Sequence, residues 1–256
     1  MTAEPYDELA GVYDWLVPEF VLAPQDSAAV FADGLALRSG ARVLDCAAGT
    51  GQLAVGLALR GFDVAATDAS GAMIERTRGL AAEHGVAVDA RTCTWEQLSD
   101  QGWADGFDAV FCIGNSLTHA AGQAARRRAL TGMAAVLREG GPLVLTSRNW
   151  ELVRAAGRGL DVGTQLVQRG GRRGLTIHVW TLAEDWDDRH DLDVAVALID
   201  DDGGVRTISE RLAFWPYAHT TLDEDLRAVG LEPLSSTYES HVERYRVVAL
   251  RGHASS

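Results

Sequence analysis

The chain has 256 residues, 47% of them hydrophobic and 23% charged, and its formal net charge is −13. This is enough apolar material for one sizeable domain, and the excess of acidic groups would repel the backbone of a nucleic acid. No stretch approaches the roughly 20 apolar residues that a membrane span needs. We therefore expect a small-molecule partner, with no nucleic acid and no membrane, and leave open whether the chain forms a homo-oligomer.

The three cysteines, Cys46, Cys93 and Cys112, form no CxxC pair and are odd in number. This spacing is typical of buried, reduced thiols and not of a disulfide framework. The first residues also lack the basic segment followed by an apolar run that a secretory signal requires. These features predict a cytoplasmic protein.

The first 40 residues are expected to form a helical lid. Helical patterns run from Tyr6 to Leu16 and from Ser27 to Leu37, and Pro18 and Pro24 interrupt the link between them.

Residues 41–150 alternate strand-like apolar runs with helical patterns, which is typical of βα units in a parallel sheet. The expected strands lie in ARVLDCA, FDVAATD, VAVDAR, GFDAVFCI and GPLVLTS. The expected helices lie in GQLAVGLALRG, AMIERTRGLAAEHG and AARRRALTGMAAVLREGG, and each ends in glycine. The basic run from Arg126 to Arg128 in the last helix is interpreted as a solvated face.

The pattern changes to period-two alternation over residues 160–216, in LTIHVWTL, LDVAVALID and VRTISERLAF. This predicts a small antiparallel β insertion. Residues 217–256 then return to the main sheet with a helix in TLDEDLRAVG and two strands in EPLSSTYES and ERYRVVALR. The whole chain, 1–256, is predicted to be one α/β domain with a Rossmann-like sheet of about seven strands, mostly parallel, with an antiparallel last strand.

The segment LDCAAGTGQLA joins the first strand to a helix through a glycine-rich turn. Gly49 and Gly51 lack a β-carbon, so the backbone can approach a ligand closely, and the helix presents unpaired N–H groups to it. Taken alone, this turn also fits a nicotinamide dinucleotide, because that pattern tolerates the alanine found at position 54.

Two acidic residues frame the turn and argue against a dinucleotide. Asp45 comes directly before the loop, where it would repel a pyrophosphate but attract a cation or an amino group. Asp68 ends the next strand, where one carboxylate can accept both hydroxyls of a ribose. The chain also contains no lysine, so the Tyr-x-x-x-Lys pair of a reductase is missing.

The segments VLDCAAGTG and ATDAS resemble the first two motifs of the class I S-adenosylmethionine-dependent methyltransferases. Further along, FCIGNSLTH and SRNW are similar to the glycine and sarcosine N-methyltransferase group of that superfamily. The resemblance runs from Val43 to Val153 and returns weakly in ERLAFWPYAHTTLDEDL. It implies the seven-stranded methyltransferase fold and S-adenosyl-L-methionine as the cofactor.

The resemblance also implies a cofactor site along the carboxyl ends of the strands, where open α/β sheets bind ligands. Asp68 would hold the ribose, and Thr94 and Trp95 would flank the adenine. The implied cofactor-binding residues are Asp45, Ala47, Gly49, Gly51, Asp68, Ala69, Thr94, Trp95, Ile113 and Asn115.

For the acceptor, Arg148 in SRNW matches the arginine by which the family grips an amino-acid carboxylate, and a guanidinium binds a carboxylate bidentately. His119 matches a position near the reacting centre. Aromatic rings would close over the acceptor and stabilise positive charge. The implied catalytic residues are His119, Arg148 and Tyr217, and the substrate-binding residues are Tyr13, Trp15, Asn115, His119, Arg148 and Tyr217.

One family feature is missing. Ala23 stands where the family has an arginine that contacts the cofactor carboxylate. Either another residue takes its place, with Arg38 and Arg42 as candidates, or the lid is arranged differently.

The resemblance therefore implies an enzyme that transfers a methyl group to the amine of a small molecule such as glycine, sarcosine or a related amino acid. Methyl transfer from a sulfonium chiefly needs alignment of the reacting atoms, so no strong base is required. The alternative is a small-molecule O- or N-methyltransferase of secondary metabolism with a non-amino-acid acceptor, because the same core hosts many substrates. A binding protein without activity is a further alternative.

The acidic turns DWDDRHD and DDDGG lack the spacing of an H-E-x-x-H or EF-hand site. We therefore predict no metal.

Overall fold

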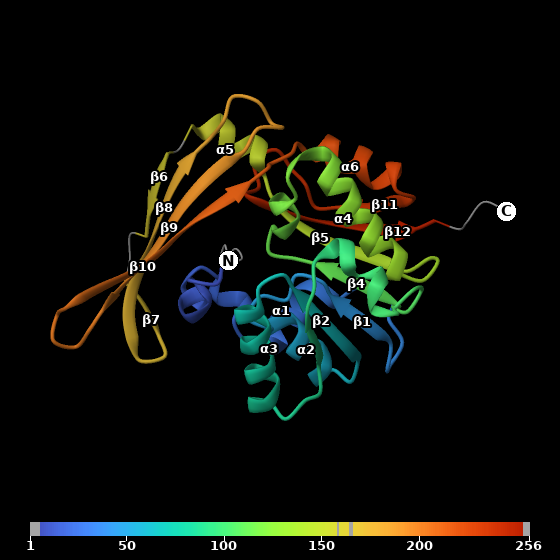
Figure 1. The fold of residues 1–256 in the computed structure, drawn as a ribbon, viewed down its shortest axis with the longest axis horizontal. Coiled ribbons are helices and arrows are strands. Elements are labelled where there is room, and N and C mark those ends of the chain that lie inside the picture. Colours follow the sequence, from blue (N-terminus) through green and yellow to red (C-terminus); the bar gives the residue numbers. More distant parts are fainter. Residues whose placement is uncertain (1–5, 158, 164–165, 253–256) are drawn as a thin grey trace.

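The computed structural model of the chain describes residues 6–157, 159–163 and 166–252. At its centre lies a seven-stranded sheet of order β11-β12-β5-β4-β1-β2-β3 (Figure 1). Its strands are β1 (Arg42–Asp45), β2 (Asp63–Asp68), β3 (Asp89–Thr92), β4 (Ala109–Cys112), β5 (Pro142–Arg148), β11 (Leu231–Ser236) and β12 (Arg244–Arg251). The pairs among β1 to β5 are parallel, whereas β12 is antiparallel to both β5 and β11. The predicted mixed sheet is confirmed.

The central strands are buried on both faces, and alternate residues enter different cores because successive side chains point to opposite sides of a strand. Leu44 and Val110 pack into one core, and Val43 and Phe111 into the other. The second core is covered by α1 (Pro24–Ala32), α2 (Gln52–Leu59) and α3 (Gly71–Glu83), and the first by α4 (Gly122–Val136) and α6 (His219–Ala228). In the described ranges, no helix has the length and apolarity to cross a bilayer.

The described part of the N-terminal region, residues 6–40, divides into two parts. The helix α1 ends at Ala32, and its Ala28 and Ala32 are buried in the core, so it belongs to the helical layer. The preceding 3₁₀ helices η1 (Ala10–Trp15) and η2 (Glu19–Val21) lie toward the edge where the parallel strands end.

The predicted insertion is a second, antiparallel sheet that projects from the main sheet (Figure 1). Its strands are β6 (Leu160–Val162), β7 (Val167–Arg169), β8 (Arg172–Thr181), β9 (His190–Ile199) and β10 (Val205–Phe214). Alternate residues of β9, including Leu192 and Val194, pack with η1 residues and with Trp150 of α5 (Trp150–Ala156) in a third core. This packing turns one face of the insertion toward the carboxyl ends of the parallel strands.

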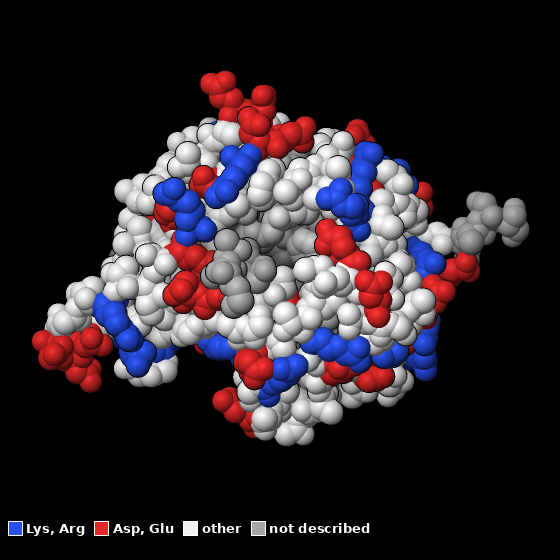
Figure 2. Space-filling view, viewed as in Figure 1, with Lys and Arg blue, Asp and Glu red and all other residues white. Residues whose placement is uncertain are grey.

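Figure 2 shows that the molecule is hollowed between the antiparallel sheet and the helices on the opposite side. Acidic side chains gather at the far end of the antiparallel sheet, where Asp200, Asp201 and Asp202 are exposed between β9 and β10.

The basic run on α4 is not a fully solvated face, so that interpretation was wrong. Arg126 is buried, and its Nε lies 2.6 Å from Oδ2 of Asp225 on α6, while Nε of Arg127 lies 2.6 Å from Oδ1. The guanidinium of Arg126 also lies 4.7 Å from the ring centre of Tyr217. Two cations on one carboxylate make this a structural junction between α4 and α6.

Cys46, Cys93 and Cys112 are buried free thiols, as predicted. Burial raises the pKa of the Cys46 and Cys93 thiols, which keeps them in the unreactive thiol form.

We expect Gly56→Ala to destabilise the protein by about 1–3 kcal/mol, the usual cost of overpacking. A β-carbon at Gly56 in α2 would overlap the carbonyl oxygen of Pro24, where α1 crosses α2. Chemical denaturation measures the change. The matched control is Gly79→Ala in α3, where a β-carbon meets nothing within 4 Å, and this variant should gain roughly 0.5–1 kcal/mol. If the two variants are equally stable, α1 and α2 do not approach each other closely at Gly56.

Candidate active site

The carboxyl ends of β1, β2, β4 and β5 meet at one edge of the sheet, and most of the predicted site residues follow them. The glycine-rich loop after β1 has positive φ angles at Gly49 (54°) and Gly51 (93°). A β-carbon at Gly51 would lie 2.9 Å from Cα of Thr77 on α3, so only glycine fits there. The Thr77 hydroxyl donates to the Gly49 carbonyl at 3.0 Å and fixes the loop against α3.

Asp68 at the end of β2 closes the other side of this loop. Its Oδ2 accepts the Gly49 N–H at 2.9 Å and its Oδ1 accepts the Ser70 N–H at 3.0 Å. Each carboxylate oxygen has a second lone-pair site, so both can still accept hydroxyl groups. Burial raises the pKa of Asp68, and the two N–H bonds oppose that shift.

Asp45 is buried at the end of β1. Its Oδ1 accepts only a long 3.4 Å bond from the Ala47 N–H, and its Oδ2 has no hydrogen-bond partner among the described residues. Burial, together with the nearby charge of Asp68, raises the pKa of Asp45 to about 7. An unpartnered buried carboxylate oxygen fits a ligand that brings an ammonium group, because such an oxygen is costly to leave without a donor.

We expect binding of a cofactor with an ammonium group to tighten as pH rises toward 7 and to level off above it. Ammonium prefers the ionised Asp45, which forms only above its raised pKa of about 7. In the free protein the sign is opposite: the raised pKa favours folding at low pH, and this contribution fades as pH rises from about 4 through 7. Calorimetric titration between pH 5.5 and 8 tests the first trend. The Asp45→Asn variant should bind the cofactor more weakly, with an affinity that does not depend on pH. If both proteins show the same dependence of affinity on pH, Asp45 does not bind the ammonium group.

A cavity of about 610 Å³ lies between the loop and the 3₁₀ helices. Ala47, Gly49 and Ile113 line it. The other predicted cofactor residues lie along the same edge: Ala69 is exposed after β2, and Thr94 and Trp95 follow β3. Trp95 is half-buried, and its indole N–H donates to the Cys46 carbonyl at 2.7 Å.

A smaller cavity of about 80 Å³ adjoins the first, and Tyr13, Leu16, Gly114 and Arg244 line both. We call it the acceptor chamber. Its remaining walls come from the N-terminal segment, the ends of β4 and β5, and the antiparallel sheet: Tyr6, Asn115, Arg148, His178, Trp180, Leu192, Val194, Leu212 and Phe214.

Asn115 positions Arg148. Its Oδ1 accepts the Arg148 backbone N–H at 2.9 Å and the Trp150 indole N–H at 3.1 Å, and its Nδ2 donates to Thr118. Asn115 lines the chamber, but its side-chain amide already forms these three hydrogen bonds within the protein. The Arg148 guanidinium faces the chamber at 5.6 Å from the Trp180 ring centre, and burial, with Arg244 nearby, lowers its pKa to about 10.

His119 stands behind the chamber wall. Its Nδ1 lies 3.0 Å from the Ala213 carbonyl, which can only accept, so Nδ1 carries the proton. Burial lowers the pKa of His119 to about 4, so the ring is neutral and Nε2 accepts the Tyr6 hydroxyl at 2.9 Å. His119 therefore orients Tyr6, and Tyr6 presents its oxygen as an acceptor.

The segment Tyr6–Trp15 covers the edge and is tied to both parts of the structure. Arg76 of α3 pairs with Asp14 at 2.9 Å and donates to the Ala10 carbonyl, and the Ser70 hydroxyl donates to Asp7 at 2.6 Å. On the other side, the Tyr6 N–H donates to Glu210 of β10 at 2.6 Å.

Besides His119, two further predicted acceptor residues lie outside both cavities. Tyr217 is buried in the core beneath Arg126, and Trp15 packs against β8, where its Nε1 would lie 2.9 Å from a β-carbon at Gly174. We therefore leave Tyr217 and Trp15 out of the proposed site.

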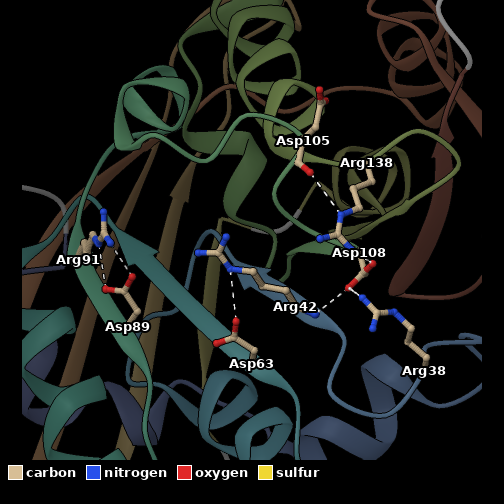
Figure 3. A network of polar contacts seen from close by, with 8 residues as sticks. All are labelled: Arg38, Arg42, Asp63, Asp89, Arg91, Asp105, Asp108 and Arg138. Atoms are coloured by element: carbon tan, nitrogen blue, oxygen red, sulfur yellow. Dashed lines mark hydrogen bonds and ion pairs between the residues drawn. The ribbon is translucent and has the colours of Figure 1, made fainter.

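Arg38 and Arg42 cannot replace the arginine missing at Ala23, so that suggestion was wrong. Figure 3 shows both at the amino ends of the strands, where Arg38 pairs with Asp108 at 3.3 Å and Arg42 with Asp63 at 3.5 Å. In a parallel sheet these ends lie at the edge opposite the loop, because all the strands run the same way.

Sequence reasoning missed several chamber residues, among them Tyr6, Arg244 and Trp180. For Arg244 a signal was present: a last strand antiparallel to β5 must begin at the edge where β5 ends. Tyr6 and Trp180 come from segments whose packing no local pattern specifies.

Comparison with known proteins agrees with this geometry. A sequence model of the methyltransferase domain matches residues 43–141. The glycine N-methyltransferase of Oryctolagus cuniculus is 30% identical over 208 residues, which cover 73% of this chain and 68% of that protein. The glycine/sarcosine N-methyltransferase of Aphanothece halophytica is 37% identical, but the match covers only 44% of this chain and 42% of that protein.

Two solved structures share the fold. The CcbJ methyltransferase of Streptomyces caelestis superposes with a TM-score of 0.74 at 24% identity, over 96% of this chain and 97% of its own. The amino pentose methyltransferase CalS10 of Micromonospora echinaspora, solved with S-adenosylmethionine bound, has a TM-score of 0.68 at 22% identity, over 94% of this chain and 95% of its own. The loop with its two framing acids, the mixed seven-stranded sheet and these similarities agree: the chain belongs to the class I S-adenosylmethionine-dependent methyltransferases, a family with S-adenosyl-L-methionine as its cofactor.

Proposed function

We propose that this protein methylates the amine of a small molecule that carries a carboxylate, with glycine, sarcosine and related amino acids as the candidate acceptors. The observation that carries the proposal is Arg148, whose guanidinium lines the acceptor chamber and forms no ion pair with any described residue. A guanidinium in such a place is suited to a carboxylate from the ligand. The relatives named for glycine and sarcosine methylation support the same class.

The described residues fit the cofactor. The unpartnered Oδ2 of Asp45 suits the ammonium group of its methionine part, and Asp68 has lone pairs left for ribose hydroxyls. When bound, S-adenosylmethionine supplies a methyl group on a positively charged sulfur, which leaves as a neutral thioether. The chain's own task is then alignment: Arg148 fixes the carboxylate and Tyr6 accepts a hydrogen bond from the amine, while the aromatic walls exclude water.

The amine has to enter the reaction unprotonated, since its nitrogen lone pair forms the new N–C bond. Nε2 of the neutral His119 accepts the hydrogen bond that the Tyr6 hydroxyl donates. The lone pairs of the Tyr6 oxygen can therefore accept an amine N–H. No described side chain needs to act as a strong base in this arrangement.

We expect Tyr6→Phe to lower kcat about 10-fold to 100-fold with little change in cofactor affinity, because only the oriented hydroxyl is lost. His119→Asn should weaken the same step by less, since Tyr6 keeps its hydroxyl. Steady-state kinetics and calorimetry separate the two effects. Unchanged kcat in Tyr6→Phe would show that the hydroxyl has no part in alignment.

The proposal is tested by a radiolabelled methyl-transfer screen over amino acids, neutral amines and amino sugars. N-methylation of amines that carry a carboxylate, in preference to their amide or ester analogues, would support it. A protein that binds S-adenosylmethionine but methylates only uncharged acceptors would overturn it and favour the alternative of a non-amino-acid acceptor.

A further inference from the structure

The acceptor chamber holds a second arginine beside Arg148. In the β5–β12 ladder, Arg244 is the direct partner of Arg148. Directly opposed residues on antiparallel strands project from the same face about 5 Å apart, and like charges in such pairs are destabilising. Both side chains line the chamber, and Arg244 also lines the larger cavity.

The positive charge at this end of the chamber is not balanced by the described residues. Neither guanidinium takes part in an ion pair among them, although most arginines of the chain do. Two acids, Glu243 and Asp161, act on Arg148 through space, and both are exposed.

His178 on β8 adds a third basic side chain to the same wall. Burial lowers the pKa of His178, and the charges of Arg148 and Arg244 lower it further. The two arginines disfavour the protonated form of His178. The positive charge at this wall is therefore that of the two guanidinium groups.

We propose that the acceptor carries two acidic groups, one held by Arg148 and the other by Arg244. This inference rests on the proposed function, because it assumes that the ligand of the chamber is an amine with a carboxylate. A single carboxylate would pair with only one of these two guanidinium groups, whereas a dianion can pair with both. An amino dicarboxylate is the simplest ligand with this charge and an amine.

The size of the chamber limits the spacing of the two acids. Its volume of about 80 Å³ favours a short amino dicarboxylate over a long one. The two cavities adjoin at Tyr13, Gly114 and Arg244, so a methyl donor in the larger cavity requires the amine end of the acceptor to face this shared wall. Aspartate is therefore the appropriate probe, with asparagine as a control of equal size and one charge less.

The test measures kcat/KM for aspartate, asparagine and glycine in the wild-type protein and in Arg244→Gln. We expect the wild type to prefer aspartate to asparagine by at least about 10-fold, and Arg244→Gln to lose roughly 10-fold to 100-fold on aspartate, the effect of one charge-assisted hydrogen bond. Activity on asparagine and glycine should change less than about 3-fold, and Arg244→Lys should recover part of the loss on aspartate.

Arg206→Gln is the matched control, because Arg206 is an exposed arginine of β10 far along the strand from the chamber end. It removes the same charge and should leave all three activities unchanged. Thermal unfolding of Arg244→Gln confirms that it folds.

Three outcomes would overturn the inference. The wild type uses asparagine as well as aspartate, or Arg244→Gln lowers all three activities equally, or it loses S-adenosylmethionine binding in calorimetry, in which case Arg244 serves the cofactor. All three leave the proposed function intact as long as glycine is methylated. Absence of methylation on every amine with a carboxylate, by contrast, would refute the proposed function itself.

Discussion

Asp68→Ala should lower the affinity for S-adenosylmethionine at least 100-fold. The variant loses two oxygens that organise the loop through the N–H groups of Gly49 and Ser70 and that, under the proposed function, also accept the ribose hydroxyls. Each hydrogen bond to a charged group is worth about 1.5–3 kcal/mol, so loss of two exceeds a 100-fold effect. Isothermal titration calorimetry gives the dissociation constant directly.

Asp63→Ala provides the control at the opposite end of the same strand. Asp63 is exposed and pairs with Arg42 away from the loop, so its removal should leave cofactor affinity unchanged (Figure 3). Asp68→Asn keeps one acceptor oxygen, so its cofactor affinity should lie between those of Asp68→Ala and Asp63→Ala. Near-native affinity in a folded Asp68→Ala protein would remove Asp68 from the site.

Arg148→Ala should raise KM for an acceptor with a carboxylate about 100-fold or more. A bidentate guanidinium–carboxylate contact supplies two charge-assisted hydrogen bonds in a partly desolvated chamber. Cofactor affinity should not change, because Arg148 lines only the acceptor chamber. Initial-rate kinetics at saturating cofactor measure KM and kcat separately.

The fold of this variant should survive, because Asn115 holds the backbone N–H of Arg148 and not its guanidinium. Arg148→Lys retains the positive charge but cannot bind a carboxylate bidentately, so its KM should lie between those of the wild type and Arg148→Ala. If the kinetics of the true acceptor barely change in Arg148→Ala, that acceptor is not bound through a carboxylate.

The predicted site residues that lie at the carboxyl edge of the sheet are those whose positions local chain geometry determines. Gly51 and Asp68 lie within one strand–loop–helix–strand unit, where a short stretch of sequence determines both the turn and the strand end. Arg148 was placed at the carboxyl edge for the same reason, because it ends a strand whose apolar run is easily recognised.

The residues that were misplaced depend on packing between distant segments. Arg126 looked solvated because its partner, Asp225, lies about 100 residues away on α6. Tyr217 was expected over the acceptor, but the turn after β10 carries it into the core below Arg126. Arg42 was one candidate for the cofactor carboxylate, although its position at the start of β1 already places it at the opposite edge of the sheet.

The segment Tyr6–Trp15 bridges the two sheets, with Asp14 held by Arg76 beside the glycine loop and Tyr6 held by Glu210 on the antiparallel sheet. These ten residues cover the loop and line the chamber, and Tyr13 lines both cavities. Displacement of this one segment would therefore expose the two cavities to solvent together.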